Sequence, residues 1–480
     1  MCRHAVRVPL KLNQAFAKAR MERRFYCQEN DKIHRFIARG NFDATGVFPL
    51  GQPAYRAKVY KMFEDKKIII WGNGREGKAL CSYFASQGRD VPVIEGKDVD
   101  FTGYDVVFKS PGISLYTPCL QRAMQSGVME FSATNLFMAM RPKTMKTIAV
   151  TGTKGKSTTS SLLYYLLKNK GFNVGYGGNI GKPLVQMIGD KYDYFVAELS
   201  SYQCADLRYP FDIAVVTNLY PEHIDWHKTH ERYYEDKLNL LRVRHAGQKA
   251  VINWQNTETL VRTKDMADLL YFNAPNAIHL SDGFVMDGSK PLFETACITN
   301  LKGEHNFENI CAVLTVLKAL GIDLDGIEKD IATFEALPHR LQTVATVQGV
   351  QYVDDSISTT PETALAALRA FEACAHHIYL LVGGYDRQQD YSILLDYIRQ
   401  NALDLVTLIT MPVTGKRVAK KAKEEGISFI ETASVSDAVR TAQAAAVQGD
   451  VVLLSPAAPS YHAYKSFEER GADFAAAIEK

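Results

Sequence analysis

Apolar and polar positions follow two patterns that alternate along most of the chain. From residue 66 onward, short runs of apolar, mostly β-branched residues are separated by longer stretches in which apolar residues recur every three or four positions. This alternation of strand and helix patterns predicts β-α-β units with parallel sheets. The predicted strands cover residues 66–71, 104–110, 146–150, 192–198, 212–218, 249–253, 350–355, 377–384, 405–410 and 450–456.

Two interruptions of this pattern divide the chain into segments. A proline and several basic residues break it at 140–144, and a long helical stretch ends at Pro338. We therefore expect three α/β domains, which agrees with about 150 residues per domain for a chain of this length. The predicted domains cover residues 66–144, 145–337 and 338–480.

The first 65 residues differ in composition from the rest of the chain. Up to Arg39 they hold ten lysines and arginines against three acidic residues, and they lack the apolar core of a secretory signal. We treat residues 1–65 as an extension without an assigned role. An appended or mis-assigned start, with Met62 as the natural first residue, is favoured over a transit peptide or an interaction arm.

The overall composition excludes several classes of partner. Hydrophobic residues make up 46% of the 480 residues and charged residues 23%, as is typical of a globular protein that buries large cores. The net charge of +3 favours neither nucleic acid nor a membrane surface, and no apolar run is long enough to span a membrane. Eight cysteines without a C-x-x-C pair argue against a disulfide framework. We expect a cytoplasmic monomer that acts on small molecules.

A glycine-rich stretch follows the predicted strand 146–150. Residues 150–159 have the sequence VTGTKGKSTT, and a helical pattern over 157–171 comes directly after the glycines. Backbone N–H groups at such a strand-to-helix turn face an anion. Lys156 would reach the terminal phosphates of a nucleotide, and Ser157 would bind Mg²⁺. The alternative is a turn that only packs the strand on the helix, but the G-K-S-T sequence favours a phosphate site with a short loop.

Polar residues stand at the carboxyl ends of two further predicted strands in the same segment. Glu198 ends one strand, and Glu222, His223 and Asp225 follow the next. Ligands of open α/β sheets bind outside the carboxyl ends of the strands. We therefore predict that Glu198 and His223 hold divalent cations beside the triphosphate, against the alternative of a surface-loop histidine.

A second glycine motif opens the predicted first domain. Gly72, Gly74 and Gly77 form a G-x-G-x-x-G pattern after the strand 66–71, and Glu95 follows the next helical stretch. Alone, this pattern indicates a dinucleotide-binding fold and an NAD(P)-dependent dehydrogenase. It is a weak signal, because related domains keep the turn without binding the cofactor.

The motifs together resemble one family of ligases. TGTKGKST (151–158) is similar to the phosphate loop of the Mur ligases and the folylpolyglutamate synthetases, and ELSSYQ (198–203) with NLYPEHIDWH (218–227) is similar to the MurD-type branch of the Mur ligases. The resemblance extends over residues 66–475. It implies a Rossmann-like N-terminal domain, a central P-loop ATPase-like domain with a parallel sheet, and a Rossmann-like C-terminal domain.

The resemblance also implies an activity and its cofactors. Enzymes of this branch use ATP to add glutamate to UDP-N-acetylmuramoyl-L-alanine, a peptidoglycan precursor of bacteria, through an acyl phosphate. Two Mg²⁺ ions are expected, held by Ser157, Glu198, His223 and a carbamate formed from CO₂ on Lys237. The implied catalytic residues are Lys156, His223, Lys237 and Arg340.

The remaining implied residues fall into three binding sets. The ATP site is expected to comprise Gly152, Thr153, Lys154, Gly155, Lys156, Ser157, Thr158, Asn306, Asn309, Arg340 and Asp355. The nucleotide-sugar site is expected to comprise Gly74, Arg75, Glu95, Ser110, Pro111, Gly112, Asn179, Ser200 and Gln203. The glutamate site is expected to comprise Thr359, Arg387, Ser460, Tyr461 and Phe467.

The chain departs from the usual pattern of the branch at three positions. Lys154 replaces an asparagine, Ile357 replaces a lysine, and Arg387 stands where a lysine is usual. Together with the other motifs, these departures favour a smaller subgroup that adds L-glutamate over the common enzymes that add D-glutamate. Folylpolyglutamate synthetase, a dehydrogenase and a non-catalytic nucleotide-binding module are less favoured alternatives.

Overall fold

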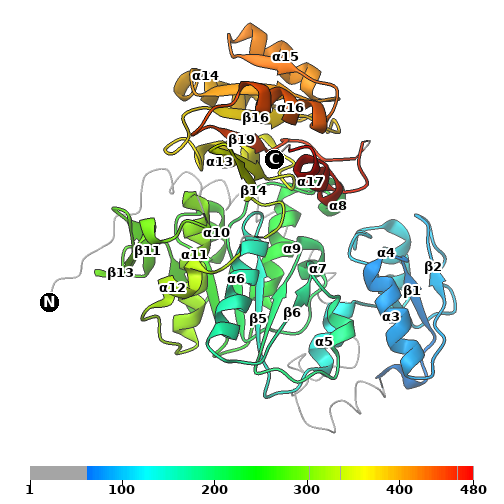
Figure 1. The fold of residues 1–480 in the computed structure, drawn as a ribbon. Helices are drawn as coiled ribbons and strands as arrows, with labels where there is room; N and C mark the ends of the chain where they lie inside the picture. The colour runs from blue at the N-terminus through cyan, green and yellow to red at the C-terminus, as the bar shows by residue number, and fades with distance from the viewer. Residues whose placement is uncertain (1–61, 302, 336, 462, 479–480) are drawn as a thin grey trace. The chain divides into compact units, whose positions relative to one another are not determined.

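The computed structural model describes residues 62–301, 303–335, 337–461 and 463–478 (Figure 1). The chain forms two compact units, one of residues 1–293 with 309–325 and the other of residues 294–308 with 326–480. The predicted extension over residues 1–65 lies outside the described residues except for its last four positions.

The first unit begins with a parallel sheet whose strand order is β2-β1-β3-β4. Every residue of β1 and β3 is buried, as expected for parallel strands that helices cover on both faces. The rings of Phe63, Phe84 and Phe131 all contact Phe108 and form the centre of this core. The elements are β1 (Ile68–Trp71), α3 (Arg75–Ser86), β2 (Val93–Ile94), β3 (Val106–Lys109), α4 (Pro118–Gln125), β4 (Met129–Phe131) and α5 (Ala133–Met140).

The larger sheet of the first unit has the order β13-β12-β11-β10-β9-β8-β5-β7-β6. Its strands run parallel from β6 to β11, β12 pairs antiparallel with β11, and β13 forms the edge. The strands are β5 (Lys146–Thr151), β6 (Val174–Gly178), β7 (Tyr194–Glu198), β8 (Ile213–Val216), β9 (Lys249–Asn253), β10 (Leu269–Phe272), β11 (Ile278–Ser281), β12 (Phe284–Asp287) and β13 (Lys290–Glu294). The helices are α6 (Lys156–Asn169), η1 (Leu184–Met187), α7 (Ser201–Ala205), α8 (Ile224–His227), α9 (His230–Arg242), α10 (Thr257–Thr263) and α11 (Glu304–Ala319), of which α11 belongs to this unit from residue 309 onward.

The second unit contains a sheet with the order β14-β15-β19-β16-β17-β18, parallel except for β14. Its strands are β14 (Gln342–Val347), β15 (Val350–Asp354), β16 (Ile378–Val382), β17 (Val406–Thr410), β18 (Phe429–Glu431) and β19 (Val451–Leu454). Its helices are η2 (Thr295–Cys297), α12 (Ile327–Ala332), α13 (Pro361–Arg369), α14 (Ser392–Asn401), α15 (Gly415–Glu424), α16 (Val435–Ala445) and α17 (Phe467–Ala476).

The structure confirms the α/β class and each of the predicted strands. One mainly parallel sheet falls in each of the three predicted segments. The two domain boundaries stay predictions, because the compact units divide the chain differently. Within the residues that the structure describes, no helix is long and apolar enough to cross a membrane.

Candidate active site

The loop between β5 and α6 needs glycine at two positions. Gly152 and Gly155 have φ angles of +152° and +80°, which other residues rarely adopt. A Cβ atom on Gly152 would lie 1.8 Å from Thr217 Oγ1, and one on Gly155 would lie 2.3 Å from Asn309 Oδ1. The sequence therefore turns sharply from β5 into α6, which begins at Lys156 with its N–H groups at the loop.

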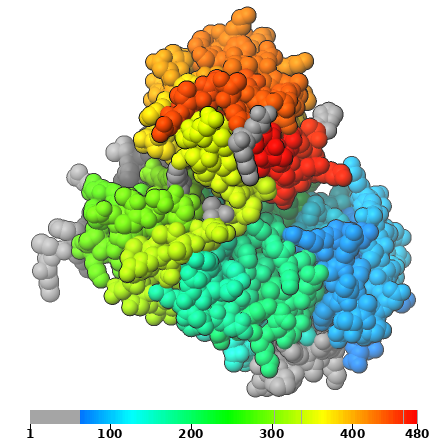
Figure 2. Space-filling view, viewed as in Figure 1, coloured from blue at the N-terminus to red at the C-terminus, as the bar shows by residue number. Residues whose placement is uncertain are grey.

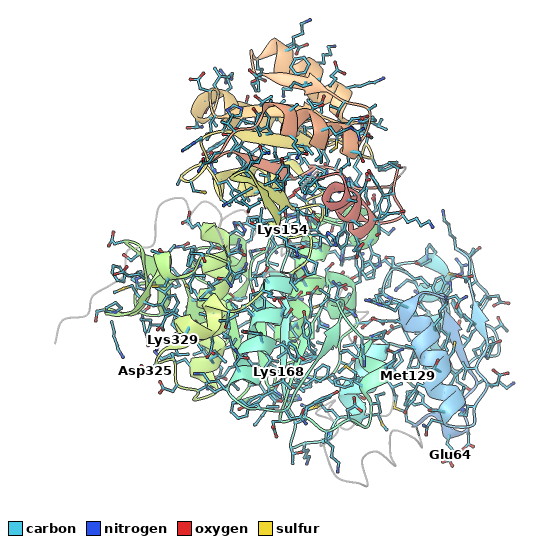
Figure 3. The ribbon with its side chains drawn as sticks, viewed as in Figure 1. Glu64, Met129, Lys154, Lys168, Asp325 and Lys329 are labelled. Atoms are coloured by element: carbon cyan, nitrogen blue, oxygen red, sulfur yellow. The ribbon has the colours of Figure 1, made fainter. Side chains whose placement is uncertain are left out.

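Lys154 fixes this loop to the segment after β8. Its backbone N–H donates to Asn218 Oδ1 at 2.8 Å, and its carbonyl accepts from Thr217 Oγ1 at 2.6 Å. Its Nζ lies 2.6 Å from Glu222 Oε1. Burial disfavours the Glu222 carboxylate, but the Lys154 ammonium outweighs that cost and lowers its pKa. Lys154 and Lys168, labelled in Figure 3, mark the two ends of α6, with Lys154 at the loop.

Two lysine side chains converge on the carbonyl groups of the loop. Lys156 Nζ donates to Gly152 O and Thr153 O, both at 2.9 Å, and Lys237 Nζ donates to Gly152 O at 2.8 Å. Lys237 lies on α9 and is only 2% exposed. Burial, together with the Lys156 ammonium, lowers the pKa of Lys237 to about 7. A neutral amine, the form that reacts with CO₂, is therefore accessible near neutral pH.

Glu198 supplies a buried carboxylate at the end of β7, the strand next to β5. It is 1% exposed, and Asn179 Nδ2 donates to its Oε1 at 2.7 Å. Its other oxygen, Oε2, is buried and accepts no hydrogen bond from any residue that the structure describes. An unsatisfied buried charge of this kind costs more than about 1–3 kcal/mol unless a cation accompanies it. The Glu198 environment therefore fits a metal ligand.

His223 stands in the loop after β8, the strand on the other side of β5. Its backbone is left-handed, with a φ of 56°, and its Nε2 lies 3.7 Å from Glu222 Oε2. The side chain keeps 47% of its surface exposed, and its ring centroid lies 5.2 Å from that of Tyr202. Partial burial and the ammonium groups of nearby lysines lower the pKa of His223, which leaves an imidazole nitrogen free to bind a metal.

The predicted metal ligands come from neighbouring strand ends. The order β8-β5-β7 brings the loop of His223, the glycine loop with Ser157, and Glu198 to the same edge of the sheet. Lys237 reaches this edge through its bond to the loop. Within the described ranges, no three His, Cys, Asp or Glu side chains form a cluster able to hold a metal. A cation here would therefore need the Ser157 hydroxyl, phosphate oxygens or a modified lysine as well.

Hydrogen bonds within the first unit, most of which is blue, cyan and green in Figure 2, connect the β1–α3 region to this edge. The Arg75 guanidinium donates to Asn179 O at 2.9 Å, and Gln203 Nε2 donates to Glu76 Oε1 at 2.6 Å. Ser200 caps α7 and also contacts Gln203. Arg75, Asn179, Ser200 and Gln203 were all predicted to bind the nucleotide sugar, and the structure brings them together.

The other predicted nucleotide-sugar residues share the carboxyl edge of the N-terminal sheet. Ser110 Oγ donates to Gly72 O at 3.2 Å, and the Pro111 carbonyl accepts from Trp226 Nε1 at 3.0 Å. Glu95 follows β2 and is exposed, and Gly74 and Gly112 are exposed as well. Because β2, β1 and β3 are adjacent and parallel, these residues follow neighbouring strand ends.

In the second unit, Asp355 and Arg340, which were both predicted to bind ATP, interact electrostatically. Asp355 follows β15 and accepts a hydrogen bond from Ser455 Oγ at 2.7 Å. Burial raises the pKa of Asp355 to about 7, although Ser455 and Arg340 favour its carboxylate. Of the two predicted asparagines on α11, Asn306 is buried in this unit, whereas Asn309 belongs to the first unit and accepts from Thr159 Oγ1 at 3.2 Å.

The residues that were predicted to bind glutamate all lie in the second unit, and the structure brings Arg387 and Tyr461 near each other. The Arg387 guanidinium lies 6.0 Å from the ring centroid of Tyr461, which is 54% exposed, and Ser460 next to it is buried. The Thr359 carbonyl accepts from Gln389 at 3.1 Å. Phe467 begins α17, where its carbonyl accepts from Ser356 Oγ at 2.8 Å.

Sequence reasoning missed several side chains that support the glycine loop. Thr153 Oγ1 lies 2.8 Å from the hydroxyl of Tyr233, and Asn218 holds Lys154 as described above. Tyr233 lies on α9, one turn before Lys237, and no motif in the sequence identified it. Asn218 lies two residues after the buried strand β8 and ends the predicted strand 212–218, and that position was the signal that could have identified it.

Comparison with known proteins gives two matches to family models. Residues 150–317 match the model described as the Mur ligase middle domain. Residues 339–458 match the model described as the Mur ligase, glutamate ligase domain.

Individual relatives are similar over most of the chain. A UDP-N-acetylmuramoyl-L-alanine--L-glutamate ligase of Xanthomonas campestris pv. campestris is 35% identical over 451 residues, which cover 86% of this chain and 95% of the relative. A ligase of the same name from Micromonospora sp. is 35% identical over 450 residues, which cover 86% and 96%. The crystal structure of MurF ligase from Thermotoga maritima in complex with ADP has a TM-score of 0.56 at 19% identity, covering 85% of this chain and 94% of that one. The similarity to the MurF structure shows a shared fold only.

Proposed function

The chain belongs to the Mur ligase family of ATP-dependent amide ligases, and from this premise we propose that it joins L-glutamate to UDP-N-acetylmuramoyl-L-alanine. The observation that carries the ligase chemistry is the buried, unsatisfied Glu198 oxygen on a strand next to the loop that Lys156 and Lys237 bind. The names of the relatives from two genera support the two substrates.

The reaction requires activation of a carboxylate, because a carboxylate and an amine do not condense at neutral pH. An oxygen of the L-alanine carboxylate forms a bond to the γ-phosphorus of ATP, and the bond from that phosphorus to ADP breaks. The amine nitrogen of glutamate then attacks the acyl carbon of the acyl phosphate. Inorganic phosphate leaves, and the amine loses its proton.

The glycine loop performs the phosphate binding in this scheme. The N–H groups at the start of α6 receive the phosphate oxygens, since a helix N-terminus favours an anion. Lys156 Nζ exchanges its bonds to the carbonyls of Gly152 and Thr153 for phosphate oxygens. Its positive charge then stabilises the negative charge that spreads during phosphoryl transfer. The roles that the resemblance implies for Arg340, at the phosphates, and for Asp355, at the ribose of ATP, stay predictions.

The residues at the sheet edge fit two Mg²⁺ ions. Ser157, Glu198, His223 and a carbamylated Lys237 would hold them, and the bound ions would neutralise charge on the phosphoryl group. The low pKa of Lys237 supports the modification, because its neutral amine adds to CO₂ and releases a proton. The carbamate replaces a cation beside Gly152 O with an anionic oxygen ligand.

The second unit supplies the amino-acid site. Arg387 attracts the side-chain carboxylate of glutamate, and Tyr461 beside it provides an exposed ring. Ile357 replaces the lysine that is usual in the D-glutamate enzymes, and this departure, together with the relatives' names, supports L-glutamate. The alternative within the family is the common ligase that adds D-glutamate.

A single assay tests the proposal. Purified protein is incubated with ATP, Mg²⁺ and UDP-N-acetylmuramoyl-L-alanine and either L- or D-glutamate, and phosphate release and product mass are measured. We expect phosphate release and a product enlarged by one glutamate with the L-enantiomer. Faster ligation of D-glutamate would contradict the stereochemical part, and no phosphate release with either enantiomer would contradict the ligase itself.

A further inference from the structure

A chain of hydrogen-bonded side chains lies next to Lys237 and has no role in the scheme above. The Tyr116 hydroxyl donates to Asp236 Oδ1 at 2.5 Å, and the other carboxylate oxygen lies 2.6 Å from His227 Nδ1. On the far side of the ring, His227 Nε2 lies 2.9 Å from Ser201 Oγ. A carboxylate only accepts, so Nδ1 donates to Asp236, and in the neutral imidazole Nε2 then accepts from the Ser201 hydroxyl.

The chain of bonds joins three of the four segments that carry predicted metal ligands, all except the glycine loop with Ser157. Glu198 ends β7, and Ser201 lies three residues later, at the start of α7. His227 lies four residues after His223, at the end of α8. The carboxylate comes from the residue directly before Lys237 on α9. These segments are separate in the sequence, and the chain of bonds fixes their mutual positions at their shared edge.

Burial indicates that this group holds the segments rather than reacting with a substrate. Serine, histidine and aspartate in this order resemble the arrangement that activates a nucleophilic serine. Ser201 is only 3% exposed and His227 is fully buried, which leaves no space for an acyl group at the serine. Buried polar networks that are fully satisfied make a site rigid.

Tyr116 extends the chain to the predicted nucleotide-sugar loop. It lies four residues after Gly112, and its ring packs against the Arg232 guanidinium at 4.4 Å. Ser114 Oγ donates to the Trp226 carbonyl at 2.6 Å, and the Trp226 indole donates to the same loop at Pro111. The segment from 111 to 116 therefore contacts three residues between His223 and Lys237, namely Trp226, Arg232 and Asp236.

We propose that Ser201, His227 and Asp236 are positioning residues for the metal site, and that Tyr116 links their arrangement to the nucleotide-sugar loop. This inference rests on the proposed function, because it assumes that Glu198, His223 and Lys237 bind the cations. Partners of this kind orient metal ligands, and their removal typically weakens metal binding or activity by about 10- to 100-fold.

The test measures metal affinity directly. Mn²⁺ binding to the full-length protein with ADP is followed by electron paramagnetic resonance, and the Mg²⁺ requirement of ligation is measured alongside. We expect Asp236→Asn to weaken Mn²⁺ binding by about 10- to 100-fold, and Tyr116→Phe to weaken it less. Asp212→Asn and Tyr192→Phe serve as matched controls, since they remove a carboxylate and a Tyr–Asp bond elsewhere in the same unit. Both controls should bind Mn²⁺ as the unaltered protein does.

Thermal unfolding shows whether each variant is folded, and His227→Gln replaces Asp236→Asn if that variant does not fold. If the folded Asp236→Asn or His227→Gln variant keeps the Mn²⁺ affinity of the unaltered protein, the positioning role is overturned. If the unaltered protein itself performs no ligation, the proposed function fails and the positioning role fails with it. Ligation by the unaltered protein together with unchanged variants overturns the positioning role alone.

Discussion

The first unit contains two glycine-rich loops that look alike in sequence and differ in chemistry. Each follows a buried parallel strand, β1 or β5, and each leads directly into a helix, α3 or α6. Each also contains a glycine with a positive φ and little room for a side chain, because a Cβ atom on Gly72, with a φ of +103°, would lie 2.6 Å from Ser110 Oγ, and one on Gly152 would lie 1.8 Å from Thr217 Oγ1. Both loops therefore turn at a glycine after the strand, but the helix N-caps differ, since Gly74 is extended with a φ of −73° and Gly155 is left-handed with a φ of +80°.

The charges around the two turns differ. The first turn of α3 carries both a cation, Arg75, and an acid, Glu76, whereas the first turn of α6 begins with Lys156 and carries no acid. Lys237 adds a second amine at the α6 loop. A helix N-terminus attracts anions, and a buried acid in the same turn opposes that attraction. The comparison teaches that glycine spacing determines the shape of such a loop, whereas the neighbouring charges determine what it binds.

The largest expected effect comes from removing the lysine that distinguishes the α6 loop. Lys156→Ala should lower the rate of ligation by about 1,000-fold or more, because a preorganised cation at the phosphates is lost. Phosphate release at saturating ATP measures this. Lys168→Ala, at the exposed opposite end of α6, is the matched control and should leave the rate unchanged. Near-normal turnover of Lys156→Ala would contradict the proposal that Lys156 makes the α6 loop a phosphate site.

Removing the second amine should have a large effect of a different kind. Lys237→Ala should lose about 100-fold or more in rate, since it removes the group proposed to carry the carbamate. Added acetate or formate should restore part of the activity by supplying the missing carboxylate oxygen. Lys156→Ala should show no such rescue, because its role is that of a cation. Equal behaviour of the two variants with acetate would contradict the carbamate.

A matched pair of glycine substitutions should give an intermediate effect. Gly155→Ala places a side chain at a φ of +80° and 2.3 Å from Asn309 Oδ1, so it strains the α6 loop by about 1–2 kcal/mol or more. We expect a rise of about 10-fold or more in the KM for ATP. Gly74→Ala meets open space at a φ of −73°, and it should leave the KM for ATP unchanged. A similar rise in both variants would mean that the two loops serve the same ligand.

The sequence predicted the α6 loop well because its signals are local. The strand 146–150, the glycines and the following helical pattern are contiguous, and their geometry follows from short-range preferences. The position of Glu198 at the end of a buried strand was predicted from the same kind of local signal, and its role as a metal ligand stays a prediction. Strands with few apolar residues were missed, such as β6 with three glycines and β2 with only two residues.

Sequence patterns could not predict the hydrogen bonds and ion pairs between side chains of the site. Asn179 bonds to Glu198 because β6 and β7 are neighbours in register, and Lys154 pairs with Glu222 across 68 positions. Lys237 lies in a charged helical stretch that predicts solvent exposure, yet it is buried. Such contacts depend on which strand ends meet, and a single sequence does not contain that information directly.

The smallest expected effect concerns the acid of the other loop. Burial raises the pKa of Glu76 from 4.5 to about 7, although its hydrogen bond from Gln203 favours the carboxylate. The folded protein therefore binds more protons than the unfolded chain between pH 4.5 and 7, so this group makes stability fall as the pH rises through that window. One such group contributes a slope of at most about 1.4 kcal/mol per pH unit.

Glu76→Gln should remove this contribution and keep the bond, since a glutamine carbonyl also accepts from Gln203. Urea unfolding of both proteins at pH 5 and pH 7 measures the difference in the free energy of unfolding. We expect the variant to gain stability relative to the unaltered protein as the pH rises from 5 to 7, with the KM for ATP unchanged at pH 7. A constant difference at both pH values would mean that the Glu76 carboxyl is solvated like an ordinary surface acid. The β1–α3 loop would then lack the buried acid that sets it apart from the phosphate loop.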